Sequence, residues 1–158
     1  MGALEISLSF LISYIAGNVP SIKDLLEINT SLEEKLEKCF KKAVSDWDVD
    51  PETKKIAGDN MPRYLIHLKE SLSHTPKGYH PKENELLRLW ADYIISDADC
   101  SAFILKHQQD IIQMDIQRGF QRAEDILSDL KSAMDEKFQR VQKKMDRLLK
   151  RGVSSCSD

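Results

Sequence analysis

The feature that most constrains this chain is a proline-free stretch from His107 to Arg151 with apolar residues at helical spacing. Successive apolar positions lie three or four residues apart, so their side chains gather on one face of an α-helix. The spacing predicts a long amphipathic helix over residues 107–151, about 67 Å in length at 1.5 Å per residue, with Gly119 as its weak point. The apolar positions are Ile112, Ile116, Phe120, Ala123, Leu127, Leu130, Met134, Phe138, Val141, Met145 and Leu148.

This pattern is also typical of a coiled coil, in which the apolar face of one helix packs against another helix. Steps of four, four and three residues insert eleven-residue units among the heptads, which leaves the helix nearly straight. We expect the helix to pair with a second copy of the chain or with a partner helix, although a helix folded back onto its own bundle would show a similar pattern. Stoichiometry and helix orientation stay open. The expected self-association seam consists of Phe120, Leu127, Leu130, Met134, Phe138, Val141, Met145 and Leu148.

The rest of the chain predicts an all-α fold, a helical bundle over residues 1–106 followed by the long C-terminal helix. Glycine and proline together supply only 11 of 158 residues, which disfavours a turn-rich β fold. Helix start signals occur at Ser21, Ser31, Asp50 and Asn60, and the breakers of residues 74–81 indicate a loop. Residues 152–158, rich in serine, predict a disordered tail.

The segment from Leu4 to Ala16 predicts a first helix that is apolar on nearly every side. Such a helix has to be buried, and we expect it at the centre of the bundle. The alternative is a segment that is released to enter a membrane or a partner. It is too short to span a membrane, which takes about 20 apolar residues.

The sequence shows no catalytic chemistry, and we expect no enzyme activity, no catalytic residues and no cofactor. The six glycines are too far apart to form a phosphate-binding loop. The four histidines lack zinc-ligand spacing to one another or to a cysteine, so no metal site is expected.

Charge and cysteine content bear on partners and compartment. The formal net charge of -3 argues against a nucleic-acid-binding domain. Residues 131–151 nevertheless carry eight basic and three acidic side chains, a net charge of +5, whereas residues 97–129 carry -4. Three cysteines without a C-x-x-C motif indicate a reducing compartment, and we expect a cytoplasmic protein.

The apolar helix from Leu4 to Ala16, the following Asn18-Val19-Pro20, the short capped helices and the long terminal helix resemble the helical N-terminal domains of NACHT-type STAND signalling proteins. More distantly, they resemble the HeLo-like bundles of cell-death effectors. The resemblance implies a non-enzymatic interaction module for oligomerisation or signalling. The alternative function is a membrane-active effector in which the first helix inserts and the basic last helix meets anionic lipid.

Overall fold

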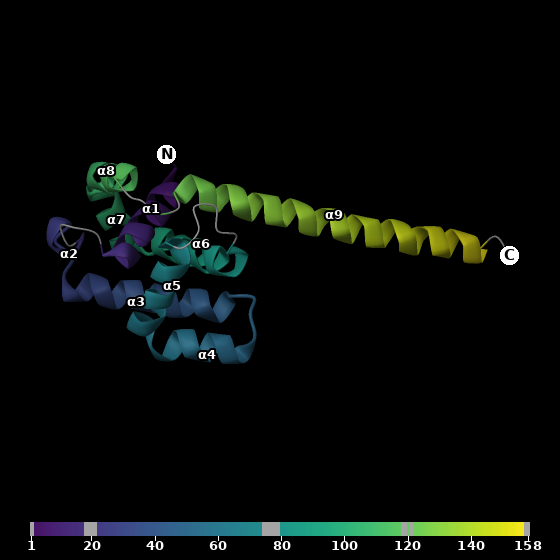
Figure 1. The fold of residues 1–158 in the computed structure, drawn as a ribbon, viewed down its shortest axis with the longest axis horizontal. Helices are drawn as coiled ribbons and strands as arrows, with labels where there is room; N and C mark the ends of the chain where they lie inside the picture. The colour runs from purple at the N-terminus through teal and green to yellow at the C-terminus, as the bar shows by residue number, and fades with distance from the viewer. Residues whose placement is uncertain (1, 18–21, 74–79, 118–119, 121, 157–158) are drawn as a thin grey trace.

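The expected all-α fold is confirmed in the computed structural model of the chain. The structure describes residues 2–17, 22–73, 80–117, 120 and 122–156, with side chains up to residue 150. These residues form nine helices and no strand, arranged as a bundle from which one long helix projects (Figure 1). The helices are α1 (Ala3–Ala16), α2 (Ile22–Leu25), α3 (Thr30–Asp46), α4 (Pro51–Asp59), α5 (Met61–Ser73), α6 (Pro81–Ser96), α7 (Ala98–Lys106), α8 (Gln108–Gln117) and α9 (Ala123–Cys156).

Helix α1 lies at the centre of the bundle, as its apolar sequence predicts. It contacts α5, α6, α7, α8 and the start of α9, and every residue from Ile6 to Ser13 is buried. Its buried polar residues are serines, whose small side chains fit into a core. Gly17 ends the helix with φ of 59°, a left-handed conformation that glycine adopts without a steric penalty.

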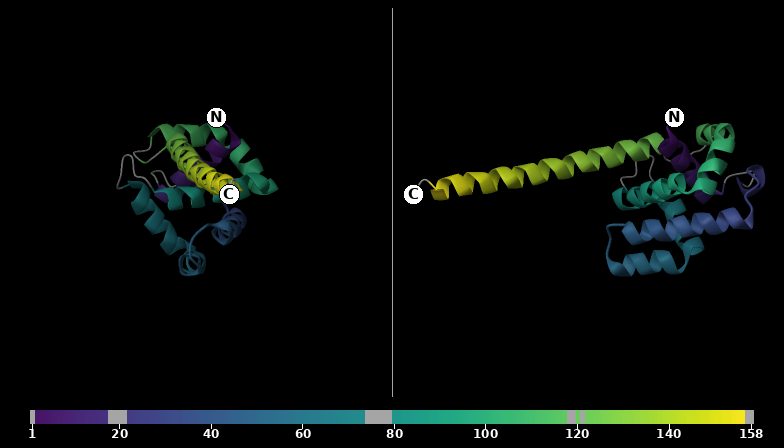
Figure 2. Two further views of the ribbon diagram at one scale, coloured as in Figure 1. Left: turned by 90° about the vertical axis from the view of Figure 1, so that its right-hand side faces the viewer. Right: turned by 180° about the vertical axis from the view of Figure 1, so that it is seen from behind.

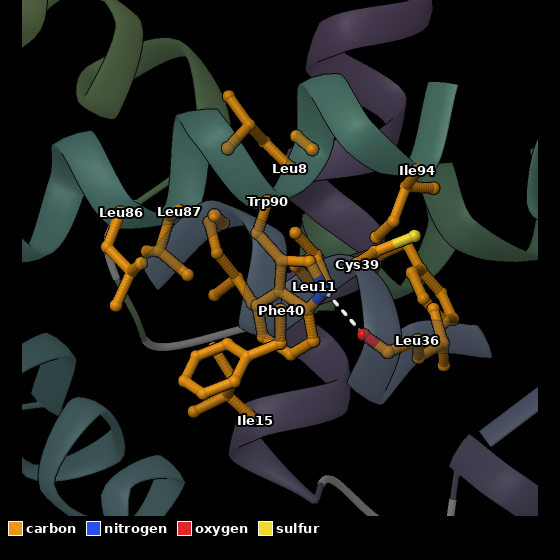
Figure 3. Close-up of a cluster of buried hydrophobic side chains, with 14 of the residues drawn as sticks. Leu8, Leu11, Ile15, Leu36, Cys39, Phe40, Leu86, Leu87, Trp90 and Ile94 are labelled. Atoms are coloured by element: carbon orange, nitrogen blue, oxygen red, sulfur yellow. Dashed lines mark hydrogen bonds between the residues drawn. The ribbon is translucent and has the colours of Figure 1, made fainter. Parts of the chain in front are cut away.

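Helix α6 packs against both α3 and α1, and side chains of all three helices belong to one cluster of buried residues (Figure 3). Trp90 of α6 is fully buried, and its indole Nε1 donates a hydrogen bond to the backbone oxygen of Leu36 at 3.0 Å. Trp47, after α3, donates in the same way to the backbone oxygen of Lys82 at 2.8 Å. Both indoles therefore join apolar packing to a satisfied polar group, which fixes α3 relative to α6.

Several helix starts coincide with the signals in the sequence. The side chains of Asp50 and Asn60 accept hydrogen bonds from Thr53 N and Arg63 N, at the starts of α4 and α5. Helix α3 is capped by Asn29 rather than by the expected Ser31, since the Asn29 side chain accepts from Leu32 N at 2.8 Å. The capping residue thus lies two residues before the expected one, and the predicted helix is present.

The long helix is shorter at its start than expected. Residues 108–117 form the separate helix α8, and α9 begins at Ala123, so the helix predicted over 107–151 is two helices with different directions (Figure 1). The reason is packing: α8 buries Ile111 beside α1, whereas α9 buries Ala123 and Ile126 at another part of the core. Gly119, the expected weak point, lies between them, outside the described residues.

The bundle therefore continues beyond the expected limit at residue 106 and includes α8 and the first turns of α9. At the other end, α9 extends to Cys156. Residues 152–156, expected in a disordered tail, are helical in the structure, and residues 157–158 lie outside the described part. Figure 2 shows α9 nearly end-on in its left view and, in its right view, extending far beyond the bundle.

Candidate interaction surface

The exposed part of α9 is the most unusual surface of the molecule. Beyond residue 133 its described side chains are all exposed. Five of the predicted seam residues lie on this part, each a large apolar side chain between 56% and 68% exposed. They are Met134, Phe138, Val141, Met145 and Leu148.

The other three predicted seam residues belong to the bundle. Phe120, Leu127 and Leu130 are half-buried and pack against the core. They lie beside Ala123 and Ile126, which are fully buried and dock the first turns of α9. The predicted seam thus has two parts, one packed inside the chain and one exposed, which we call the open seam.

The open part has the regular heptad spacing that the whole seam lacks. From Met134 to Leu148 the steps are four, three, four and three residues, so Phe138 and Met145 take heptad position a, and Met134, Val141 and Leu148 take position d. The irregular step from Leu130 through Met134 to Phe138 falls where α9 leaves the bundle. The steps from Phe120 through Ala123 and Leu127 to Leu130 are regular too, so the irregular step separates two heptad runs of different register.

Residues beside the seam widen it and add charge. Leu149, at position e, is 65% exposed and was not among the predicted seam residues. A heptad assignment that starts at Phe138 places Leu149 beside the seam, so the sequence contained the signal for it. Lys137 and Lys144 occupy position g, on the other side of the seam.

A groove of about 440 Å³ lies where α9 departs from α6. Leu130 and Met134 form its apolar side, and Glu85, Arg88 and Arg140 are among its charged side chains. The groove adjoins the open seam, so a helix that follows the seam toward the bundle would reach it.

A second, larger cavity of about 880 Å³ lies between α4, α5 and the start of α6. Trp47, Ile56 and Tyr64 supply apolar walls, and burial raises the pKa of Tyr64 to about 12. Polar groups at its rim support local structure: Asp50 caps α4, and Lys82 Nζ donates to the backbone oxygen of Asp48 at 2.7 Å. Its lining also includes His67 and Glu83, whose Nε2 and Oε1 atoms lie 3.7 Å apart.

The structure also brings together three side chains that the sequence analysis did not connect. Cys39 of α3 lies close to Cys100 of α7 and to Asp97, which joins α6 and α7. Their potential ligand atoms are all within 4.8 Å of one another. The expectation of no metal site was based on spacing along the chain, and spacing cannot reveal ligands that come from separate helices.

Among the described residues, no helix combines the length and the hydropathy needed to cross a membrane. Helix α1 is apolar but has 14 residues, and α9 is long but strongly charged.

No model of a known protein family matches this chain, and no curated protein or solved structure is significantly similar to it. The resemblance to NACHT-type N-terminal domains and HeLo-like bundles thus stays a prediction. The function has to be argued from the surface itself.

Proposed function

We propose that this protein is a non-enzymatic oligomerisation module in which the open seam of α9 pairs with α9 of a second copy. The observation that carries this proposal is the row of five large apolar side chains, each more than half exposed, at regular heptad spacing on a projecting helix. A continuous apolar stripe of this kind marks an interaction site in a water-soluble chain. Pairing two identical seams removes both stripes from water.

A second copy suits the seam because it carries the same heptad spacing in the same register. In a parallel pair Phe138 meets Phe138 of the second copy, and the flexible side chains of Met134 and Met145 adapt to the space beside the phenyl rings. From Met134 to Leu148 the seam is about 21 Å long at 1.5 Å per residue. Two heptads bury little surface, so we expect a weak, concentration-dependent assembly with Kd on the order of micromolar.

The flanking charges favour a parallel pair. In a parallel coiled coil, position g of one helix lies beside position e of the next heptad of its partner. Lys137 then faces Gln142, and Lys144 faces Leu149. An antiparallel pair would instead place g beside g, which brings lysines together. A parallel pair also holds both bundles at the same end, an arrangement suited to bringing attached domains together.

The positive charge of α9 supplies a test that separates a second copy from an anionic partner. Residues 131–151 carry a net charge of +5, so these segments of two copies repel each other, and salt screens that repulsion. Self-association should therefore strengthen as the salt concentration rises. Binding to nucleic acid or anionic lipid should weaken under the same change.

The main experiment is sedimentation equilibrium of the full chain at concentrations up to about 100 micromolar. We expect wild type to assemble and Phe138→Glu to remain monomeric at every concentration. Gln139→Glu is the matched control, because it adds the same charge one residue away on a face outside the seam. Leu130 is not a suitable target, since it packs against the core.

Three results would contradict the proposal. They are a wild-type monomer throughout the range, equal assembly of the two glutamate variants, and assembly that weakens with salt. Circular dichroism checks that both variants keep the helical content of wild type.

The membrane-active alternative enters the same test as a competing outcome. It requires α1 to leave a position in which nearly all its side chains are buried. Leakage of anionic vesicles caused by the wild-type chain, together with a wild-type monomer in solution, would favour that function over self-association.

A further inference from the structure

Two buried cysteines and one carboxylate converge where α3 meets the junction of α6 and α7. Cys39 is 5% exposed and Cys100 is 1% exposed. Figure 3 shows Cys39 among the core side chains of α3, with its sulfur on the side where Ile94 of α6 lies. The two cysteines are 61 positions apart along the chain, so the tertiary fold alone places them together.

Asp97 is held rigidly beside these thiols by backbone hydrogen bonds. Its N–H donates to the backbone oxygens of Tyr93 and Ile94 at the end of α6. Its Oδ1 accepts from Asp99 N at 3.0 Å and from Cys100 N at 2.9 Å at the start of α7. One carboxylate oxygen is thus used as a helix cap, and the other oxygen can serve as a ligand.

The charges at this cluster suit a cation. The backbone hydrogen bond from Cys100 lowers the pKa of Asp97, which keeps this carboxylate ionised at neutral pH. A divalent ion replaces the protons of both thiols when it binds.

We propose that Cys39, Asp97 and Cys100 form a binding site for a thiophilic divalent cation of the Zn²⁺ type. Two sulfur donors and one carboxylate oxygen are ligands that zinc accepts, whereas Mg²⁺ and Ca²⁺ require oxygen donors. In a tetrahedral site, zinc–sulfur bonds of about 2.3 Å place two sulfurs about 3.8 Å apart. The ligand atoms lie within 4.8 Å of one another, so side-chain adjustments of about 1 Å close the site.

Binding is an exchange of ions without oxidation or reduction. Two S–H bonds break, two bonds between sulfur and metal form, and both protons pass to solvent. The carboxylate adds a third bond, and a water molecule completes the coordination from the side of Asp97, the least buried of the three residues. Because its ligands come from α3 and from the α6–α7 junction, the ion ties these helices together.

The test is a titration of the reduced full chain with Co²⁺, which replaces zinc and gives an absorption band when thiolates bind it. Cys156→Ser serves as the background, because it leaves Cys39 and Cys100 as the only thiols. We expect one Co²⁺ per chain, a thiolate-to-cobalt band, displacement by Zn²⁺, and a rise in Tm with Zn²⁺.

Three variants test the ligands. Cys39→Ser and Cys100→Ser should lose the band. Asp97→Asn keeps a helix-capping side chain and both thiols but should bind at least about tenfold more weakly, since even outer-shell changes weaken metal sites by this factor. Asp99→Asn is the matched control, because it makes the same change two residues away on a carboxylate that pairs with Lys35 instead. It should bind as wild type does.

The proposal is overturned if the folded Cys156→Ser chain binds no Co²⁺, or if binding persists in both serine variants. It is also overturned if the reduced chain binds no metal while peroxide oxidises Cys39 and Cys100 to a disulfide. If a serine variant does not fold, the comparison of Asp97→Asn with Asp99→Asn still decides, because both keep the thiols.

Discussion

The most informative test of the fold is the truncation of Leu11 to alanine in the central helix. Leu11 is fully buried in α1, which other helices surround. The change removes three carbon atoms, and at about 0.8 kcal/mol per methylene this withdraws roughly 2.4 kcal/mol of transfer free energy. Because the neighbouring helices cannot collapse fully into the space, a cavity adds about 1 to 2 kcal/mol more. We therefore expect the free energy of unfolding to fall by about 4 kcal/mol.

Urea denaturation measures this loss. With a slope of about 2 kcal/mol per molar urea, the midpoint should move down by about 2 M without a change in slope. Leu105→Ala is the matched control, because Leu105 is 65% exposed on α7. It should change stability by less than about 0.5 kcal/mol.

Hydrogen exchange gives an independent reading of α1. The amides of α1 should be protected as strongly as those of α6, since both helices belong to the same core. A loss below about 1 kcal/mol in Leu11→Ala, with rapid exchange throughout α1, would refute the core assignment. That outcome would favour a helix poised for release.

Two further predictions address the cap at Asp97 and the orientation of α9. Backbone hydrogen bonds hold the pKa of Asp97 in the folded protein below its ordinary value. The ionised Asp97 therefore stabilises the fold above its ordinary pKa, and this stabilisation is lost as pH falls through the lowered pKa. With chelator present, the Tm of wild type should drop more steeply below about pH 4 than the Tm of Asp97→Asn. If α9 pairs in parallel, Leu148→Cys in a Cys156→Ser background should form a disulfide-linked dimer under mild oxidation, whereas Gln139→Cys should not. Assembly of the first variant without cross-linking would contradict the parallel arrangement.

Local sequence signals predicted most of the helices. Asp50 before Pro51 and Asn60 before Pro62 mark helix starts by a mechanism that acts within one turn, and both side chains cap as expected. The apolar character of α1 likewise led to its central position, since a helix without a polar face has to be covered on all sides.

The candidate surface was predicted only in part. The spacing from Phe120 to Leu148 is one pattern in the sequence, and nothing local to it tells which residues pack inside the chain. The fold decides this, because Ala123 and Ile126 dock on the core and carry Leu127 and Leu130 with them. The free seam begins at Met134, where the bundle ends.

The sequence alone therefore determined the helical class, most helix starts and the apolar stripe of α9. These features follow from periodicity and capping, which depend on neighbours three or four residues away. The break between α8 and α9, the division of the stripe and the meeting of Cys39 with Cys100 depend on contacts between distant segments. Such contacts depend on which helices pack into the core together, and the spacing of residues within one helix does not contain that information.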